Sequence, residues 1–306
     1  DDSSGASEAY DALVEGDAAR VELAYVDSLS SEEQDAYYAD ATAQYDESEA
    51  GLADVPTALQ ALFAAPYVLG QPVVELIVEN GGNEAVDDAF GDPPATSEHL
   101  FDPRTYFAGD ASIDVDEPGL PDGADEIGET DALGATTLFV MLAERIDPLV
   151  ALSAADGWGG DVYVAYGLDE RTCVRAAFAG DTAADTDEIA QALQAWAAAG
   201  PAGAASVVAG AEEVAFESCA AELDGGTTPP ATGRSLDALG LPAARAQLMA
   251  VAEADGGLDH DEAFAFGDCF VHRVPLDTLT QANESADPPA EVAEAIDTAM
   301  IECMRG

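Results

Sequence analysis

The chain contains three histidines, and His260 is the one with the chemically richest surroundings. It lies in the string DHDE, where Asp259, Asp261 and Glu262 add three carboxylates. Imidazole and carboxylate groups are common metal ligands, so a weak metal site at this string is one interpretation. Residues adjacent in sequence rarely point at a single ion, and a solvated loop is the competing interpretation.

His99 and His272, the other two histidines, are expected to have ordinary surface or capping roles. The chain has no GxSxG elbow, no P-loop, no GxGxxG after a strand and no HExxH helix. The sequence therefore predicts no catalytic residue set.

The string GWGGD at 157–161 is a second candidate site. Gly159 and Gly160 permit backbone angles that other residues avoid, whereas Trp158 favours burial. A tight turn that anchors a strand accounts for this combination. The alternative is a binding pocket at Trp158 and Asp161.

Residues 110–131 form the most acidic stretch of the chain, and it is punctuated by proline and glycine. The density of carboxylates could bind calcium, but the stretch lacks the spaced ligands, the glycine and the final glutamate of an EF-hand loop. A solvated loop at a boundary between structural units is the favoured interpretation, with a calcium-binding module as the alternative.

The four cysteines have no CxxC spacing and no histidine cluster beside them, which argues against structural zinc. Four cysteines allow three disulfide connectivities. We favour Cys173 with Cys219 and Cys269 with Cys303, because each pair brackets a compact stretch of strand and helix. Two disulfides would place the protein in an oxidising compartment outside the cytoplasm.

The charge balance excludes several classes of partner. The chain of 306 residues has 62 acidic residues against nine basic ones, and its formal net charge is -53. Nucleic-acid backbones and anionic membranes need positive charge on the protein, so neither is expected to bind. A surface this acidic fits a salty or extracellular setting, where screening weakens the self-repulsion.

The sequence predicts no membrane span, because no uninterrupted apolar run reaches about 18 residues. The first residues, DDSSGASEAYDAL, do not resemble a signal peptide. If the protein is exported, we expect a segment upstream of residue 1 to have been removed or left out of this sequence.

The N-terminal third is expected to be helical. Apolar spacing predicts two or three helices over 6–50, followed by a break at 51–56. In the apolar stretch that follows, Pro66 and Pro72 are expected to split two buried helices, and Gly82 with its neighbouring glycine should close the second.

The middle of the chain predicts a small antiparallel sheet covered on one face. Alternating β-branched and aromatic residues indicate a hairpin over 157–180, an amphipathic helix follows over 181–200, and one or two further strands are expected beyond it. A core helix is expected over 133–146. A linker at 225–233 then leads into C-terminal helices.

The fold class that follows is α+β, predominantly helical, with the small sheet in the middle and a helical C-terminal region stapled by a disulfide. We expect three units. They are a helical one over 1–110, an α+β unit over 111–225, and a helical region over 226–306.

Several strings, read together, resemble a family of secreted, often lipid-anchored bacterial proteins related to gluzincin-type zinc metallopeptidases. The matching pieces keep the order of that family and cover roughly residues 10–200. They are ALVEGDAARVELAY at 12–25, APYVLGQPVVELIVENGGNEAVDDAF at 65–90, PPATSEHLFDPRTY at 93–106, LGATTLFVMLAER at 133–145, GWGGDVYVAY at 157–166 and DTAADTDEIAQAL at 181–193.

In such enzymes an upstream HExxH helix supplies two histidines to zinc, and a downstream helix supplies a glutamate as the third ligand. The resemblance places Glu15 at that glutamate and Asp17 as the neighbour that supports it from outside the metal's direct ligands. No HExxH precedes Glu15 in this chain. Zinc is therefore expected only if a missing upstream segment carries the two histidines, and no cofactor is expected otherwise.

The leading functional hypothesis is a non-catalytic, metallopeptidase-like protein of the cell exterior that acts by protein-protein contact as a surface or complex-associated subunit. Its partners would be proteins, and a lipid anchor would lie upstream of residue 1. One alternative is the processed C-terminal part of an active zinc metallopeptidase. The other is a calcium-binding module.

Overall fold

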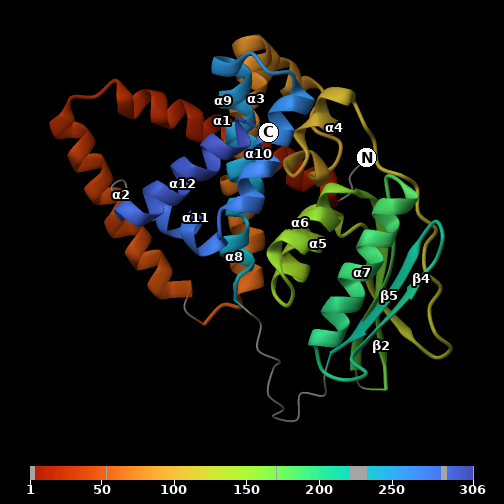
Figure 1. Ribbon diagram of the computed structural model, residues 1–306. Coiled ribbons are helices and arrows are strands. Elements are labelled where there is room, and N and C mark those ends of the chain that lie inside the picture. Colours follow the sequence, from red (N-terminus) through yellow and green to blue (C-terminus); the bar gives the residue numbers. More distant parts are fainter. Residues whose placement is uncertain (1–3, 53, 170, 221–232, 284–287, 306) are drawn as a thin grey trace.

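Helices surround one side of a five-stranded antiparallel sheet in the computed structural model, as Figure 1 shows. The structure describes residues 4–52, 54–169, 171–220, 233–283 and 288–305. The predominantly helical α+β class predicted from the sequence is confirmed.

The N-terminal part is helical, as expected. Its elements are α1 (Ser4–Asp27), α2 (Ser31–Leu52), α3 (Thr57–Gly91), the 3-10 helix η1 (Ser97–Leu100) and α4 (Pro103–Ala108). Helices α1 and α3 pack closely because two glycines face each other. A Cβ on Gly70 would lie 2.0 Å from the carbonyl oxygen of Ala12, and one on Gly16 would lie 2.4 Å from the backbone of Gly70.

The prediction that Pro66 and Pro72 split this region is wrong. Both prolines lie inside α3, which continues through them. The one non-helical residue inside α3 is Gly82, with φ of 67°, so the chain turns there as the sequence predicted. A proline removes one helical hydrogen bond, and burial of the apolar residues around it offsets that loss.

The sheet has the strand order β1-β2-β3-β5-β4, and every neighbouring pair is antiparallel. The predicted hairpin and the predicted strand pair are both present. The register places Cys173 opposite Cys219, where they form a disulfide. The strands are β1 (Asp125–Asp131), β2 (Trp158–Leu168), β3 (Arg171–Gly180), β4 (Ala205–Ala209) and β5 (Val214–Cys219).

Strand β1 was not predicted, since residues 110–131 were expected to be a loop throughout. The last seven of those residues, DEIGETD, pair with β2 at the sheet edge. Five of them are exposed, and therefore no apolar alternation marks the strand in the sequence. Residues 110–121 have no regular secondary structure, in keeping with the prediction.

Helices α5 (Gly134–Ala143), α6 (Pro148–Asp156) and α7 (Ala183–Ala199) join the sheet to the helical part. Helix α7 begins with a capping box, in which Thr182 and Asp185 bond reciprocally to each other's backbone. It packs on the sheet through Trp196, whose ring centroid lies 5.7 Å from that of Phe216.

The C-terminal region is helical, as predicted. It contains α8 (Ser235–Ala238), α9 (Gly240–Gly256), α10 (His260–Arg273), α11 (Leu276–Asn283) and α12 (Ala290–Cys303). A disulfide between Cys269 and Cys303 joins α10 to α12, which confirms the second predicted pairing. Apart from Gly233, the expected linker at 225–233 lies outside the described residues.

One hydrophobic core draws on all three segments that the sequence suggested as units. It includes Leu69 from the first, Leu142 from the second and Leu241 from the third, each almost fully buried. The segments therefore share buried side chains within one continuous cluster. Helix α2 lies apart from this core, at the left edge of Figure 1, and nearly all of its described side chains are exposed.

Among the described residues, one helix is long and apolar enough by length and composition to cross a membrane, and it is α3. The sequence prediction counted uninterrupted apolar runs, whereas α3 reaches this composition on average over 18 residues. Core helices of water-soluble proteins meet the same criterion, and α3 packs against α1 and α9.

Candidate functional site

Asp161 and Trp158, which the sequence suggested as a pocket, lie at the start of β2 beside the N-terminus of α5. The Asp161 carboxylate accepts hydrogen bonds from the backbone N–H of Leu133 at 2.7 Å and of Gly134 at 2.9 Å. It also accepts one from the indole N–H of Trp158, at 2.9 Å. The side chain thus satisfies otherwise unpaired donors at the first turn of α5.

The glycines of the GWGGD string allow a close approach of another segment, not a tight turn. The strand carries a bulge between Trp158 and Gly160. The backbone N–H of Ile113 donates to the carbonyl of Gly159 at 2.7 Å. A Cβ on Gly160 would lie 2.2 Å from the carbonyl oxygen of Ile113, so a larger residue would push this segment away.

A cavity of about 210 Å³ opens beside these residues. Trp158 and Asp161 line it, together with Thr96 and Asp114. Asp114 comes from the acidic stretch that suggested calcium binding. The hydroxyl oxygen of Thr96 is buried and has no hydrogen-bond partner within the described part of the chain.

Residues 96–102, which begin at this cavity with Thr96, are all buried although five of the seven are polar; we call this stretch the buried polar segment. Thr96, Ser97, Glu98, His99 and Asp102 are all at most 5% exposed. Such burial requires partners, and most of these side chains have them. The Ser97 hydroxyl accepts from the backbone N–H of Thr136 at 3.3 Å, and His99 Nδ1 lies 2.7 Å from the hydroxyl of Thr105.

Burial shifts the pKa values of the ionisable groups around this segment. It raises the pKa of Glu8 to about 7 and that of Glu98 to about 10, because the ionised carboxylates lose hydration. The nearby carboxylate of Asp181 adds to the shift of Glu98. Burial also lowers the pKa of His99 to about 4, so its imidazole is neutral at pH 7.

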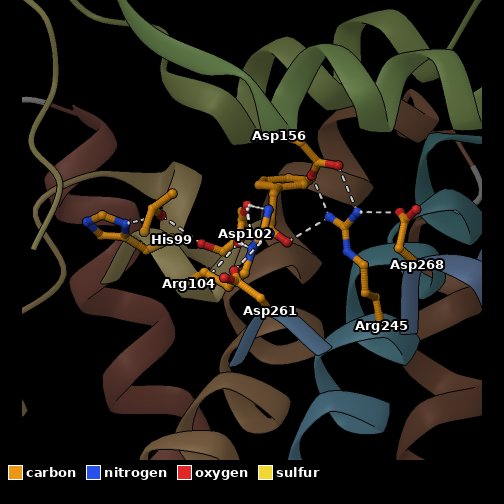
Figure 2. A network of polar contacts seen from close by, with 9 residues as sticks. His99, Asp102, Arg104, Asp156, Arg245, Asp261 and Asp268 are labelled. Atoms are coloured by element: carbon orange, nitrogen blue, oxygen red, sulfur yellow. Dashed lines mark hydrogen bonds and ion pairs between the residues drawn. The ribbon is translucent and has the colours of Figure 1, made fainter. Parts of the chain in front are cut away.

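Ion pairs extend this polar region toward the C-terminal helices, as Figure 2 shows. Asp102 caps α4 by accepting from the backbone N–H of Arg104 at 3.0 Å, and it also pairs with the Arg104 guanidinium. That guanidinium lies 3.3 Å from Asp261 and 3.6 Å from the centre of the Phe264 ring. These contacts join α4 to α10.

Arg245 on α9 lies at the centre of the second half of this network (Figure 2). Its side chain is 0% exposed, pairs with Asp156 from α6, and lies 3.1 Å from Asp268. It also donates to the backbone carbonyl of Phe101 at 2.7 Å. The arginine therefore joins three parts of the chain that are distant in sequence, and its partners hold it in a structural role.

His260 is the first residue of α10, so the DHDE string begins a helix and is not the solvated loop that the sequence favoured. The Nδ1 of His260 pairs with Glu253 at 2.7 Å, and its ring stacks on Phe107. Asp259 caps α10 by accepting from the backbone N–H of Glu262, and Asp261 pairs with Arg104. His260 and Glu253 line a cavity of about 310 Å³.

His272, by contrast, is exposed near the end of α10, with its Nδ1 2.9 Å from the carbonyl oxygen of Asp268. Within the described ranges, no group of three or more histidine, cysteine, aspartate or glutamate side chains is arranged to hold a metal ion.

Glu15 and Asp17 lie on α1 and are both half-buried. Asp17 pairs with Arg20 at 2.6 Å, and Arg20 also donates to Asn83 on α3 at 3.0 Å. Arg20 therefore joins the two helices, and Asp17 pairs with it from within α1. The proposed role of Glu15 as a third zinc ligand stays a prediction from the resemblance.

A row of exposed apolar side chains lies in the first turns of α3. On α3, Leu59, Phe63 and Tyr67 are 56%, 73% and 51% exposed. Their spacing of four residues places them on one side of the helix, and we call this set the apolar stripe. The rings of Phe63 and Tyr67 lie 6.1 Å apart.

A family model described as "Domain of unknown function (DUF8575)" matches residues 125–239, from β1 to the residue after α8. No curated protein and no solved structure matches the chain. The matched stretch contains the whole sheet, whereas the apolar stripe lies outside it.

Proposed function

We propose that this chain is a non-catalytic protein of the cell exterior that acts by protein-protein contact, and that the apolar stripe on α3 is its contact surface. The two disulfides support an oxidising, extracytoplasmic environment. The likeness to zinc metallopeptidases remains part of this proposal. Within it, Glu15 would bind zinc only together with an upstream HExxH segment.

The observation that carries the proposal is the exposure of Leu59, Phe63 and Tyr67 on one side of α3. An isolated exposed apolar residue needs no explanation, but aligned aromatic and aliphatic side chains are typical of contact sites. Burial of such a side chain contributes about 1.5 to 3 kcal/mol relative to exposure. A partner that covers the stripe would gain part of this energy from each of the three, because each is between 51% and 73% exposed.

The charge of the chain specifies the chemistry of the partner. No charged residue occurs from Thr57 to Val74, so the stripe itself is neutral. The rest of the chain is strongly acidic, with a net charge of -53. The partner that fits is therefore a protein segment with apolar side chains at its centre and arginine or lysine at its rim.

The experiment compares the double variant Phe63→Ser/Tyr67→Ser with the wild type in a binding assay against proteins of the native cell exterior. Val208→Ser is the control, because Val208 is 65% exposed on the edge strand β4, outside α3. We expect the double variant to lose a partner that the wild type and the control retain, with unchanged thermal stability. Equal binding by all three proteins would contradict the proposal.

A further inference from the structure

A cavity of about 510 Å³ lies where the end of α5 and the start of α6 meet α10 and α11. It is separate from the buried polar segment and from the apolar stripe. Its size is within the range of small-molecule sites, which is roughly 300 to 1,000 Å³.

Positive charge is concentrated at this cavity. Arg145, Arg234 and Arg273 line it, and these are three of the nine basic residues in the chain. Asp147 and Asp277 line it as well, so among the lining side chains the arginines outnumber the carboxylates by three to two. In the chain as a whole, by contrast, there are 62 acidic residues.

Of the three arginines, Arg145 has the guanidinium that is most available to a ligand. Its guanidinium stacks on the Trp196 ring, 3.7 Å from the ring centre. A Cβ on Gly200 would lie 2.5 Å from one guanidinium nitrogen, so glycine at that position leaves room for the group. Within the described residues Arg145 makes no ion pair, and its five N–H donors remain for an acceptor.

The other two arginines are already paired, at exposed positions. Arg234 pairs with Asp277, which is 79% exposed, and Arg273 lies 3.3 Å from Glu302, which is 57% exposed. Exposed pairs contribute little, so a ligand can compete for these groups. Arg273 also fits the usual preference for positive charge at a helix C-terminus, but Arg234 precedes the first turn of α8, where that preference does not apply.

The walls of the cavity are mainly apolar. Leu149, Leu241, Val271, Val274 and Leu276 contribute to them. A bare inorganic oxyanion would leave these side chains uncovered. A ligand with an apolar body and a carboxylate would cover them and also place its charge by the arginines, which bind carboxylates in a bidentate manner.

We propose that this cavity, called the arginine cavity, binds a small organic carboxylate, with the carboxylate at Arg145 and the apolar body against the wall formed by Leu149, Leu241 and Val274. This inference is independent of the proposed contact surface. It assigns a ligand class to a site that lies at the junction of α5, α10 and α11.

Calorimetric titration of the full chain tests the proposal, at the lowest salt concentration at which the protein is fully folded. The probes are hexanoate, its neutral analogue hexanamide, and inorganic phosphate. We expect hexanoate to bind at one site, with hexanamide and phosphate each at least 10-fold weaker. Arg145→Gln should weaken hexanoate binding at least 10-fold, whereas Arg171→Gln, which changes an arginine in the sheet, should not.

Arg273→Gln provides a second test if the Arg145 variant fails to fold, because Arg273 is exposed at the end of α10. It should weaken hexanoate binding more than Arg171→Gln does. Absence of hexanoate binding at millimolar concentration would overturn the proposal. Equal affinity for hexanoate and hexanamide, or for hexanoate and phosphate, would overturn it as well.

Discussion

The buried guanidinium of Arg245 illustrates how single residues hold this acidic chain together. A buried charge is tolerated only when it is paired and hydrogen-bonded. Arg245 meets this condition through Asp156, Asp268 and the carbonyl of Phe101. Because these partners come from α6, α10 and the buried polar segment, one side chain holds three regions in register.

Replacing this arginine should destabilise the fold strongly. We expect Arg245→Met to lower the free energy of unfolding by about 3 to 5 kcal/mol, since Asp156 would lose its partner. Urea denaturation at constant salt measures the change. Arg171→Met is the matched control, because its guanidinium donates to the carbonyl of Ala220 at an exposed site. A loss equal to that of the control would refute the role given to Arg245.

The raised pKa of Glu8 predicts a specific dependence of folding stability on pH. Its pKa is raised from 4.5 to about 7 in the folded protein, so the folded state holds this proton more tightly than the unfolded state. The contribution of Glu8 to stability is therefore present below about pH 4.5 and is lost as the pH rises to about 7.

Glu8→Gln should remove this loss, because the amide does not ionise. We expect the stability of the variant relative to the wild type to increase by roughly 1 to 3 kcal/mol between pH 4.5 and pH 7.5. Unfolding of both proteins at the two pH values gives the difference. A constant difference would show that Glu8 titrates normally.

At the scale of elements, those with a regular pattern were predictable and those stabilised by distant contacts were not. Alternation in sequence predicted the hairpin of β2 and β3, and the Thr182 and Asp185 pair marked the start of α7. Strand β1 was not predicted, because its residues are mostly exposed and acidic and show no apolar alternation. The passage of α3 through Pro66 and Pro72 depends on tertiary packing, which local rules do not describe.

Among the candidate sites too, those marked by a local sequence pattern were predictable, and those formed by residues distant in sequence were not. The string GWGGD drew attention to Trp158 and Asp161, which do lie together at one cavity. The buried polar segment gave no signal, since a polar sequence is expected to be exposed. The convergence of Arg145, Arg234 and Arg273 depends on residues that are far apart in the sequence, which no local pattern brings together.

The turn in α3 gives a prediction at this scale. Gly82 has a positive φ of 67°, and a Cβ there would meet no atom within 4 Å. Gly82→Ala should therefore destabilise through backbone strain alone, by about 1 kcal/mol. Gly91→Ala is the control, because it also meets no atom and has no positive φ. Equal stabilities for the two variants, measured by urea denaturation, would contradict this account of the turn.

At the scale of the whole molecule, the net charge of -53 sets the conditions under which the fold is stable. Like charges repel in the compact state, and salt screens them over about 10 Å at 0.1 M. The two disulfides restrict the conformational freedom of the unfolded chain. They therefore stabilise the folded state and offset part of the destabilisation that this repulsion causes.

The unfolding temperature should therefore rise with sodium chloride, by roughly 5 °C or more between 0.1 and 2 M. Calorimetry measures it. Adding 5 mM calcium chloride at constant ionic strength distinguishes screening from specific binding by the acidic stretch. Screening alone predicts no further shift, whereas a clear rise with calcium would favour the calcium-binding alternative.

The contact proposed at the apolar stripe is the central functional claim, and site-specific photo-crosslinking tests it most directly. A photoreactive phenylalanine analogue replaces Phe63, and the same analogue at Val208 serves as the control. After irradiation in the native cell exterior, mass spectrometry identifies the crosslinked peptide. The account predicts one protein segment with apolar residues flanked by arginine or lysine, crosslinked from position 63 and not from 208. Crosslinks from 63 to lipid alone, to unrelated peptides, or at the level of the control would contradict it.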